Sequence, residues 1–240
     1  MADYLLPLKE RKEIAEDTMA FWFDISGTNF NFKPGQYAVF TLINPPLTDE
    51  EGNIRSFSIA SCPKNKNQIM IASRVRNTAF KNSLKSIKIG TKVKISGPLG
   101  SFTLHENNKK PAVFLAGGIG ITPFRSMIEF AAQEKLSHKI YLFYSNKTPK
   151  STAFLKDLED FSKKNKNFKF IPTVTEYEGK DWKYEFGRCN IEMIKKYVKD
   201  IKKPIYYSAG PPGMVAAMKA MLLESGIKED NIKTEDFVGY

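Results

Sequence analysis

The sequence predicts two domains of different architecture: an antiparallel β domain followed by an α/β domain with a parallel sheet. From residue 18 to about residue 104, short strand-like runs alternate with turn signals such as KPG, NPP and GPLG, which is typical of an antiparallel barrel or sandwich. After the polar segment HENNKKP (105–111), apolar strands alternate with helices. This alternation implies a parallel sheet with helices on both faces. We therefore expect domains at residues 1–106 and 107–240.

The strands of the first domain are predicted from runs of alternating or β-branched residues. These runs are TMAFWFDI, QYAVFTLI, RSFSIAS, QIMIASRV and KVKISG. In QIMIASRV, strict alternation places Ile69, Ile71, Ser73 and Val75 on one face. RSFSIAS is unusual, because a strand that only fills a core does not need an arginine, an aromatic ring and three hydroxyls.

A short helix within RVRNTAFKNSLKSIKIG offers a candidate anion site. Thr78 can cap this helix, and Lys81 lies in its first turn. Its inward face is predicted to carry Phe80, Leu84 and Ile87. Arg55 of RSFSIAS is then a natural bidentate partner for the same phosphate. A well-capped helix without a ligand is the alternative.

The segment AVFLAGGIGITPFRSMIEFAAQ is the most specific in the chain. A strand runs into Gly117, Gly118 and Gly120, and we expect Thr122 to be the N-cap and Pro123 the first helical residue. The buried stripe of this helix is predicted to be Phe124, Met127, Ile128 and Ala131. Glycines let a pyrophosphate approach the backbone amides at a helix N-terminus. The spacing is not that of the GxGxxG fingerprint, and a tight turn without a ligand is the alternative.

A second glycine turn occurs in YYSAGPPGMVAAMKAMLLESG. Gly210 and Pro211 follow an apolar strand, and open α/β sheets bind ligands at the carboxyl ends of such strands. The helix that follows is expected to contribute Met214, Met218, Met221 and Leu222 to the core, and not to a ligand site.

Composition indicates a globular protein and disfavours several other classes. The 240 residues are 42% hydrophobic, and no apolar run reaches the roughly 18 residues of a membrane span. The first residues lack the order of a secretory signal, so we expect a cytoplasmic location. Metal chemistry is not expected, because two cysteines and two histidines, Cys62, Cys189, His105 and His138, are isolated in the sequence.

The formal net charge of +11 leaves three kinds of partner open: a nucleic acid, an anionic cofactor or an acidic protein. The lysines are scattered and lack interleaved aromatic residues. A solvated lysine-rich surface is therefore the simplest interpretation, and binding of nucleic acid is not expected.

Five ordered motifs make the chain resemble the ferredoxin–NADP reductase family. They are RSFS (55–58), GPLGSF (97–102), GGIGITP (117–123), AGPPGM (209–214) and EDF (235–237). The likeness extends from KPGQ (33–36) to the C-terminus. It implies a Greek-key β-barrel that binds flavin, followed by an α/β domain that binds NADH or NADPH.

The resemblance also explains the composition of RSFSIAS. It implies that Arg55 holds the flavin pyrophosphate, that Phe57 lies against the isoalloxazine or ribityl chain, and that the Ser58 hydroxyl bonds flavin N5. Alternation places Ser58 on the face opposite Arg55 and Phe57, so the flavin would have to wrap the end of the strand. FAD is expected and not FMN, because Thr78 and Lys81 offer a phosphate site in addition to Arg55.

The expected site has a catalytic pair and a larger cofactor-binding set. The catalytic pair is Ser58 and Phe237. The cofactor-binding set is Arg55, Phe57, Ser58, Ile59, Arg74, Thr78, Lys81, Gly117, Gly118, Gly120, Thr122, Pro123, Ser145, Gly210, Pro211 and Phe237.

Three positions depart from the family pattern. Phe57 stands where the family usually has tyrosine, so stacking is kept and a hydroxyl contact is lost. Ala209 stands where several relatives have a cysteine. Plant-type members end at an aromatic residue two positions after a glutamate, whereas this chain continues from Phe237 to Tyr240. Phe237 is our candidate for the ring that shields the flavin, with Tyr240 as its rival.

The leading functional hypothesis is an NAD(P)H-dependent reductase that transfers electrons from FAD to a separate acceptor. Without iron–sulfur cysteines, the chain would need an external acceptor: a ferredoxin, a flavodoxin, an oxygenase component, a ferric chelate or free flavin. The net charge of +11 favours an acidic ferredoxin or flavodoxin. The alternative from another class is a flavin-binding electron-transfer or sensor subunit without turnover of its own. The oligomeric state stays open.

The choice of nucleotide depends on charges near the adenosine ribose. Family members that prefer NADP typically hold its 2′-phosphate with a serine–arginine pair, and the matching place here is Thr175–Glu176. A carboxylate would repel the phosphate and favour NADH, whereas Lys147 favours NADPH. Exposed charges are screened, so we expect a preference for NADH of about tenfold.

Overall fold

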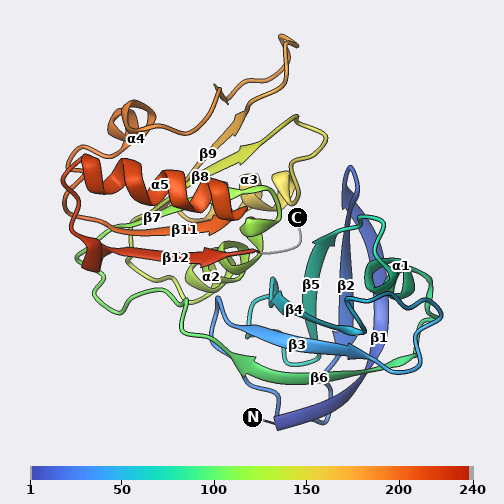
Figure 1. Ribbon diagram of the computed structural model, residues 1–240. Helices are drawn as coiled ribbons and strands as arrows, with labels where there is room; N and C mark the ends of the chain where they lie inside the picture. Colours follow the sequence, from blue (N-terminus) through green and yellow to red (C-terminus); the bar gives the residue numbers. More distant parts are fainter. Residues whose placement is uncertain (1, 238–240) are drawn as a thin grey trace.

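The computed structural model describes residues 2–237 and contains two six-stranded sheets (Figure 1). The first sheet is antiparallel, with the strand order β4-β3-β6-β1-β2-β5. The second sheet is parallel, with the order β10-β9-β8-β7-β11-β12. The predicted fold class, an antiparallel barrel followed by an α/β domain, is confirmed.

The elements follow the chain in two groups. The first group is β1 (Ala2–Ala15), β2 (Thr18–Asp24), β3 (Tyr37–Leu42), β4 (Ile54–Ser58), β5 (Gln68–Arg74), α1 (Ala79–Ser86) and β6 (Lys92–Leu99). The second group begins with β7 (Ala112–Gly117), the 3₁₀ turn η1 (Gly118–Gly120), α2 (Ile121–Gln133), β8 (Ile140–Asn146), α3 (Leu155–Lys164) and β9 (Phe168–Val174). It continues with β10 (Glu185–Phe186), α4 (Ile191–Tyr197), β11 (Ile205–Gly210), α5 (Pro212–Glu224), the 3₁₀ turn η2 (Glu229–Asn231) and β12 (Ile232–Asp236).

Strand β1 was not predicted, because the expected strands began at residue 18. Its second half is charged, and it contains Pro7, a residue that normally argues against a central strand. The structure places Pro7 where β1 changes partners, since residues up to Pro7 pair with β6 and residues from Leu8 onward pair with β2. Leu6 and Leu8 flank the proline and are both buried in the barrel core.

The edges of the first sheet meet just beyond Ser58, which closes the barrel. The Ala60 amide donates to the Met70 carbonyl at 2.7 Å, and the Met70 amide donates to Ser61 Oγ at 2.9 Å. Segment 60–62 is thereby attached to β5, and all three of its residues are buried.

Strands β2 and β5 are buried on both faces. Phe21 and Ile71 point into the barrel core, and Ile71 lies there with Ile69, which alternation places on the same face. The opposite face of these strands, which carries Ala20, Met70 and Ala72, belongs to a second core cluster. That cluster also contains the predicted stripe of α2, namely Phe124, Met127, Ile128 and Ala131. The two domains therefore share one apolar core between the barrel wall and α2.

The segment between the two sheets is fastened to the second sheet. The His105 amide donates to Tyr207 Oη at 2.9 Å, and His105 Nδ1 lies 2.9 Å from the same oxygen. His138 Nε2 lies 2.8 Å from the His105 carbonyl oxygen, and the two imidazole rings are 5.2 Å apart. The histidines predicted to be isolated are therefore in contact, because they precede β7 and β8, which pair with each other.

Neither metal ligation nor a membrane crossing is indicated by the described residues. Among residues 2–237, no three or more His, Cys, Asp or Glu side chains group in a way that could hold a metal ion. Over the same range, no helix combines the length and apolarity that a membrane crossing requires.

Candidate functional site

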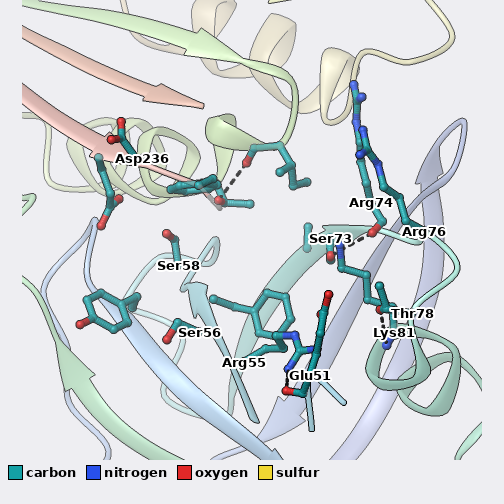
Figure 2. A pocket seen from close by; sticks show the side chains of 17 residues that line it. Glu51, Arg55, Ser56, Ser58, Ser73, Arg74, Arg76, Thr78, Lys81 and Asp236 are labelled. Carbon is teal, nitrogen blue, oxygen red and sulfur yellow. Dashed lines mark hydrogen bonds and ion pairs between the residues drawn. The ribbon is translucent and has the colours of Figure 1, made fainter. Parts of the chain in front are cut away.

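A cavity of about 580 Å³ lies where the end of β4 faces the start of α2 and the end of β12 (Figure 2). This volume is typical of sites for small molecules and cofactors. Its walls include Arg55, Phe57, Ser58, Arg74, Thr78 and Lys81 from the first domain, and Ile119, Thr122, Glu235 and Phe237 from the second. Many residues that the sequence predicted as a site are therefore gathered around one space.

The end of β4 presents both of its faces to this cavity. Arg55 and Phe57 share one face of the strand, and Ser58, which is 6% exposed, lies on the other. Phe57 is supported by the rings of Phe40 and Phe80, at centroid distances of 5.6 and 5.8 Å. A ligand in the cavity can therefore meet a cation, an aromatic ring and a hydroxyl from one short strand.

The anionic part of a ligand would meet the start of α1. Thr78 is the N-cap, as predicted, and its Oγ1 accepts from the Lys81 amide at 3.4 Å. Burial lowers the pKa of Lys81, and the positive charges of Arg76 and Arg55 lower it further. An anion bound here would counter both effects. The donor set therefore fits a phosphate-containing ligand.

Glu51 is a part of the site that sequence reasoning missed. Its Oε2 lies 2.6 Å from Arg55 Nη2, and its main-chain carbonyl accepts from Arg55 Nη1 at 2.8 Å. Figure 2 shows this pair at the lower edge of the cavity. Glu51 and Arg55 are four residues apart, but they lie in a loop and a strand, where that spacing carries no expectation of contact. The arginine that was predicted to bind phosphate therefore already has a carboxylate partner.

The two glycine turns of the second domain pack against each other. A Cβ on Gly120 would lie 2.2 Å from the Ala209 carbonyl oxygen, and a Cβ on Gly117 would lie 2.3 Å from Met214 Sδ. Gly210 has a φ of +152°, a backbone angle that residues with a side chain rarely adopt. Packing alone thus accounts for glycine at these positions, whether or not a nucleotide binds.

The prediction for the start of α2 was wrong. The helix begins at Ile121 with Gly120 as N-cap, so Thr122 and Pro123 are its second and third residues. The 3₁₀ turn η1 already winds the chain before the helix, and this feature was absent from the expected pattern. The Thr122 hydroxyl donates to the Ile119 carbonyl at 3.0 Å and so closes the turn beside the cavity.

The other predicted positions separate into three groups. Ile59 is fully buried in the barrel core, so its side chain is part of the packing. Gly118 and Ser145 lie at the carboxyl ends of adjacent strands, where Tyr144 Oη donates to the Gly118 carbonyl at 3.0 Å. Pro211 is the N-cap of α5.

Of the four residues of α5 that were predicted to lie in the core, three do so and one does not. Leu222 is buried, and Met218 and Met221 are partly buried against the same cluster. Met214 instead lies over the glycine turns, as its closeness to Gly117 shows.

The C-terminal segment lines the cavity opposite β4. The Phe237 amide donates to the Gly210 carbonyl at 3.0 Å, which connects the tail to the second glycine turn. Tyr240, the rival candidate for the shielding ring, lies outside the described residues. Glu235 Oε2 is buried and has no hydrogen-bond partner within residues 2–237. Burial raises the pKa of Glu235 to about 7.

We predict that Glu235→Gln changes how stability depends on pH. The folded state keeps the Glu235 proton up to about pH 7, whereas the unfolded chain releases it near pH 4.3. The wild type should therefore lose stability as pH rises through this window, and the neutral glutamine should lose less. In thermal unfolding from pH 4.5 to 8, the stability of E235Q relative to the wild type should rise with pH until about pH 7.5. Parallel curves for the two proteins would contradict the raised pKa.

Two family patterns match most of the chain. The family described as Oxidoreductase FAD-binding domain matches residues 5–104, and the family described as Oxidoreductase NAD-binding domain matches residues 114–220. These matches fall on the antiparallel domain and the parallel domain respectively.

Curated relatives are about 30% identical to this chain over the residues that align. One component of the Na⁺-translocating NADH-quinone reductase of Pseudoalteromonas atlantica is 30% identical over 205 residues, which are 79% of this chain and 50% of the relative. The electron transfer component of anthranilate 1,2-dioxygenase of Acinetobacter baylyi is 29% identical over 229 residues, which are 94% of this chain and 64% of the relative. The chain thus spans about half to two thirds of the length of these relatives.

Solved structures share the whole fold. The FAD/NAD-binding domain of the Vibrio cholerae nitric oxide dioxygenase superimposes with a TM-score of 0.84 at 19% identity, covering 98% of this chain and 99% of that one. A ferredoxin NADP⁺ reductase from Neisseria gonorrhoeae gives 0.80 at 18% identity, covering 98% of both chains. Because one of these two family patterns matches each domain, the chain belongs to the ferredoxin–NADP reductase-like family of flavoproteins, oxidoreductases with an FAD-binding and an NAD-binding domain.

Proposed function

We propose that this chain accepts a hydride from NADH or NADPH onto FAD and passes electrons to a separate acidic electron-transfer protein, such as a ferredoxin or flavodoxin. The observation that carries the proposal is that the end of β4, the start of α2 and Phe237 line one shared cavity. FAD, when bound, supplies the ability to accept a hydride and to release electrons singly. The protein supplies the positions of the two cofactors.

The proposed roles follow from where each side chain lies. Arg55 and Lys81 would hold the two phosphates of FAD, and Phe57 would pack on its flavin portion. The buried Ser58 hydroxyl would donate a hydrogen bond to the flavin ring. Phe237 would cover the ring until the nicotinamide displaces it, which makes the tail a gate. The domain limits, 1–106 and 107–240, form part of the same proposal.

The remaining predicted residues would hold the nucleotide or complete the flavin site. Arg74 and Thr78 line the flavin side of the cavity, and Thr122 lines its nucleotide side. The carboxyl edge of the parallel sheet would meet the nucleotide through Gly117, Gly118, Gly120, Pro123, Ser145, Gly210 and Pro211. Ile59 would act through the backbone that follows Ser58.

Charge and the relatives support a protein acceptor. The net charge of +11 would attract an acidic partner. One relative is named as an electron transfer component and another as part of a quinone reductase. The cytoplasmic location expected from the sequence stays a prediction.

A panel of acceptors tests this function. Protein reduced anaerobically by NADH would be mixed with an oxidised ferredoxin, a flavodoxin, free FMN or a ferric chelate. We expect the fastest reoxidation with ferredoxin or flavodoxin, at a rate that falls with added salt because steering is electrostatic. Faster transfer to FMN or ferric chelate would favour a small-molecule reductase. Absence of flavin reduction by either nucleotide would favour a flavin-binding protein without turnover of its own.

Replacing Ser58 tests its role in the chemical step. A neutral hydrogen bond contributes about 0.5–1.5 kcal/mol, so Ser58→Ala should slow flavin reduction roughly 2- to 13-fold if the bond forms in the transition state. The bound FAD should be retained, as measured by its absorbance after gel filtration. Single-turnover reduction at the wild-type rate would remove Ser58 from the mechanism.

Lys147 and Glu176, which suggested opposite nucleotides in the sequence, form an ion pair in the structure. Lys147 Nζ lies 3.1 Å from Glu176 Oε1 and 3.2 Å from Oε2. Both side chains are more than half exposed, at 64% and 59%, so the pair is partly screened. The ammonium and the carboxylate largely cancel, so the preference for NADH proposed from Glu176 should be modest.

We predict that Glu176→Gln shifts the preference toward NADPH. The change frees Lys147 for a 2′-phosphate, and kcat/KM for NADPH relative to NADH should rise about tenfold, the worth of about 1.4 kcal/mol. Glu178→Gln removes an exposed carboxylate of the same loop and serves as the matched control. The assignment fails if both variants give the same ratio, or if the wild type already favours NADPH.

A further inference from the structure

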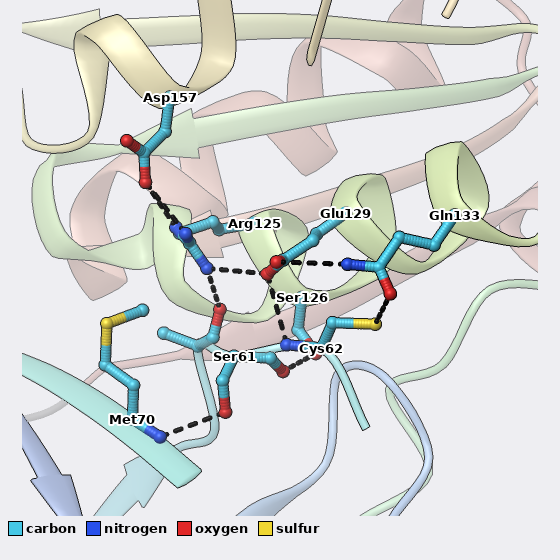
Figure 3. A network of polar contacts seen from close by, with 9 residues as sticks. Ser61, Cys62, Met70, Arg125, Ser126, Glu129, Gln133 and Asp157 are labelled. Carbon is cyan, nitrogen blue, oxygen red and sulfur yellow. Dashed lines mark hydrogen bonds and ion pairs between the residues drawn. The ribbon is translucent and has the colours of Figure 1, made fainter. Parts of the chain in front are cut away.

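The buried arginine Arg125 joins the two domains next to the candidate site. It lies on α2, its side chain is 10% exposed, and its Nη1 donates to the Ala60 carbonyl at 2.8 Å. Ala60 belongs to the barrel and follows Ser58 by two residues. The same guanidinium contacts Glu129 at 2.9 Å and Asp157 at 2.7 Å (Figure 3).

Three consecutive residues of the barrel are bonded to α2. Besides the Ala60 carbonyl, the Ser61 carbonyl accepts from Ser126 Oγ at 2.6 Å, and the Cys62 amide donates to Glu129 Oε2 at 3.2 Å. Glu129 Oε2 also accepts from Arg125. One carboxylate therefore connects the arginine to the barrel backbone a second time, and segment 60–62 is held along its length.

The bonded segments run directly into the two halves of the site. Segment 60–62 continues from Ser58, which lines the flavin side of the cavity. Helix α2 follows the 3₁₀ turn that contains Ile119 and has Thr122 as its second residue, and both residues line the other side. A shift at Arg125 would therefore be transmitted to both sides of the cavity within a few residues.

We propose that Arg125 is a positioning residue for hydride transfer: by fixing segment 60–62 against α2, it sets the placement of Ser58 relative to the turn at residues 119–122. This proposal rests on hydride entry from a nicotinamide nucleotide and not on which acceptor takes the electrons. Misplacement by about 1 Å can cost about 100-fold in rate while binding is kept.

An arginine suits this role better than a lysine. Its Nε and Nη2 both reach Asp157 on α3, while Nη1 reaches Ala60 and Glu129. The guanidinium also lies over the ring of Phe154, 4.9 Å from its centroid. A lysine has a single nitrogen, which cannot occupy these positions at once. Arg125→Lys therefore keeps the buried charge but should lose the bond to the barrel.

The test compares Arg125→Lys and Ser126→Ala with the control Lys64→Ala. Lys64 makes an ion pair with Glu134 at 2.7 Å that also joins the barrel to α2, but this pair is exposed. Flavin reduction is followed in single turnovers at saturating NADH, without any acceptor. We expect the rate of flavin reduction to fall at least about tenfold in R125K and by a smaller factor in S126A. K64A should stay within twofold of the wild type.

Two further measurements separate positioning from loss of structure. Equilibrium titration should give dissociation constants for FAD and NAD⁺ within threefold of the wild type in R125K. Hydrogen exchange should show faster exchange of the Cys62 amide, while the core strands stay protected.

The proposal is overturned if exchange at Cys62 is unchanged in R125K, or if reduction keeps the wild-type rate despite faster exchange. Weakened binding of both cofactors in proportion to the rate loss would also overturn it, since that indicates a structural role only. Failure of the acceptor panel leaves these measurements unaffected, because no acceptor is present in them.

Discussion

The second buried face of β2 and β5 is the constraint on which the arrangement of the two domains depends. An antiparallel strand commonly leaves one face to solvent. Here the outer face carries Ala20, Met70 and Ala72 and packs in one core with α2. The two alanines are small enough to let a helix approach closely. Because this core fixes α2 against the barrel, the end of β4 and the start of α2 come to face each other across one cavity.

Most of the fold could be predicted because its patterns are local. Short strand-like runs between turn signals identified β2 to β6, and the alternation of strands with helices identified the parallel domain. Strand β1 could not be found in this way, because Pro7 and the following charges conceal a strand that changes partners there. The burial of β5 on both faces could not be predicted either, since alternation in the sequence indicates only one buried face.

Many residues that line the cavity could be singled out from the sequence, but the ion pairs made by its charged side chains could not. Arg55, Ser58 and Lys81, which were singled out from the sequence, line one cavity. The partners that modify them come from loops with no pattern of their own, as Glu51 does for Arg55. Lys147 and Glu176 illustrate the same limit: each suggested an opposite nucleotide, and only the fold shows that they form a pair.

The contact between Glu51 and Arg55 also changes how cofactor uptake should be viewed. A carboxylate already serves as counter-ion in a pocket that Arg74, Arg76 and Lys81 also line. If Arg55 holds an FAD phosphate as proposed, binding of FAD would exchange one anion for another at Arg55, and the contribution of Arg55 to affinity would be the difference between two charge-assisted contacts. Without a ligand, the Glu51 carboxylate offsets only a part of the repulsion that Arg76 and Arg55 exert on Lys81. On this proposal, retention of FAD would depend on contacts along the whole length of the cofactor and not on Arg55 alone.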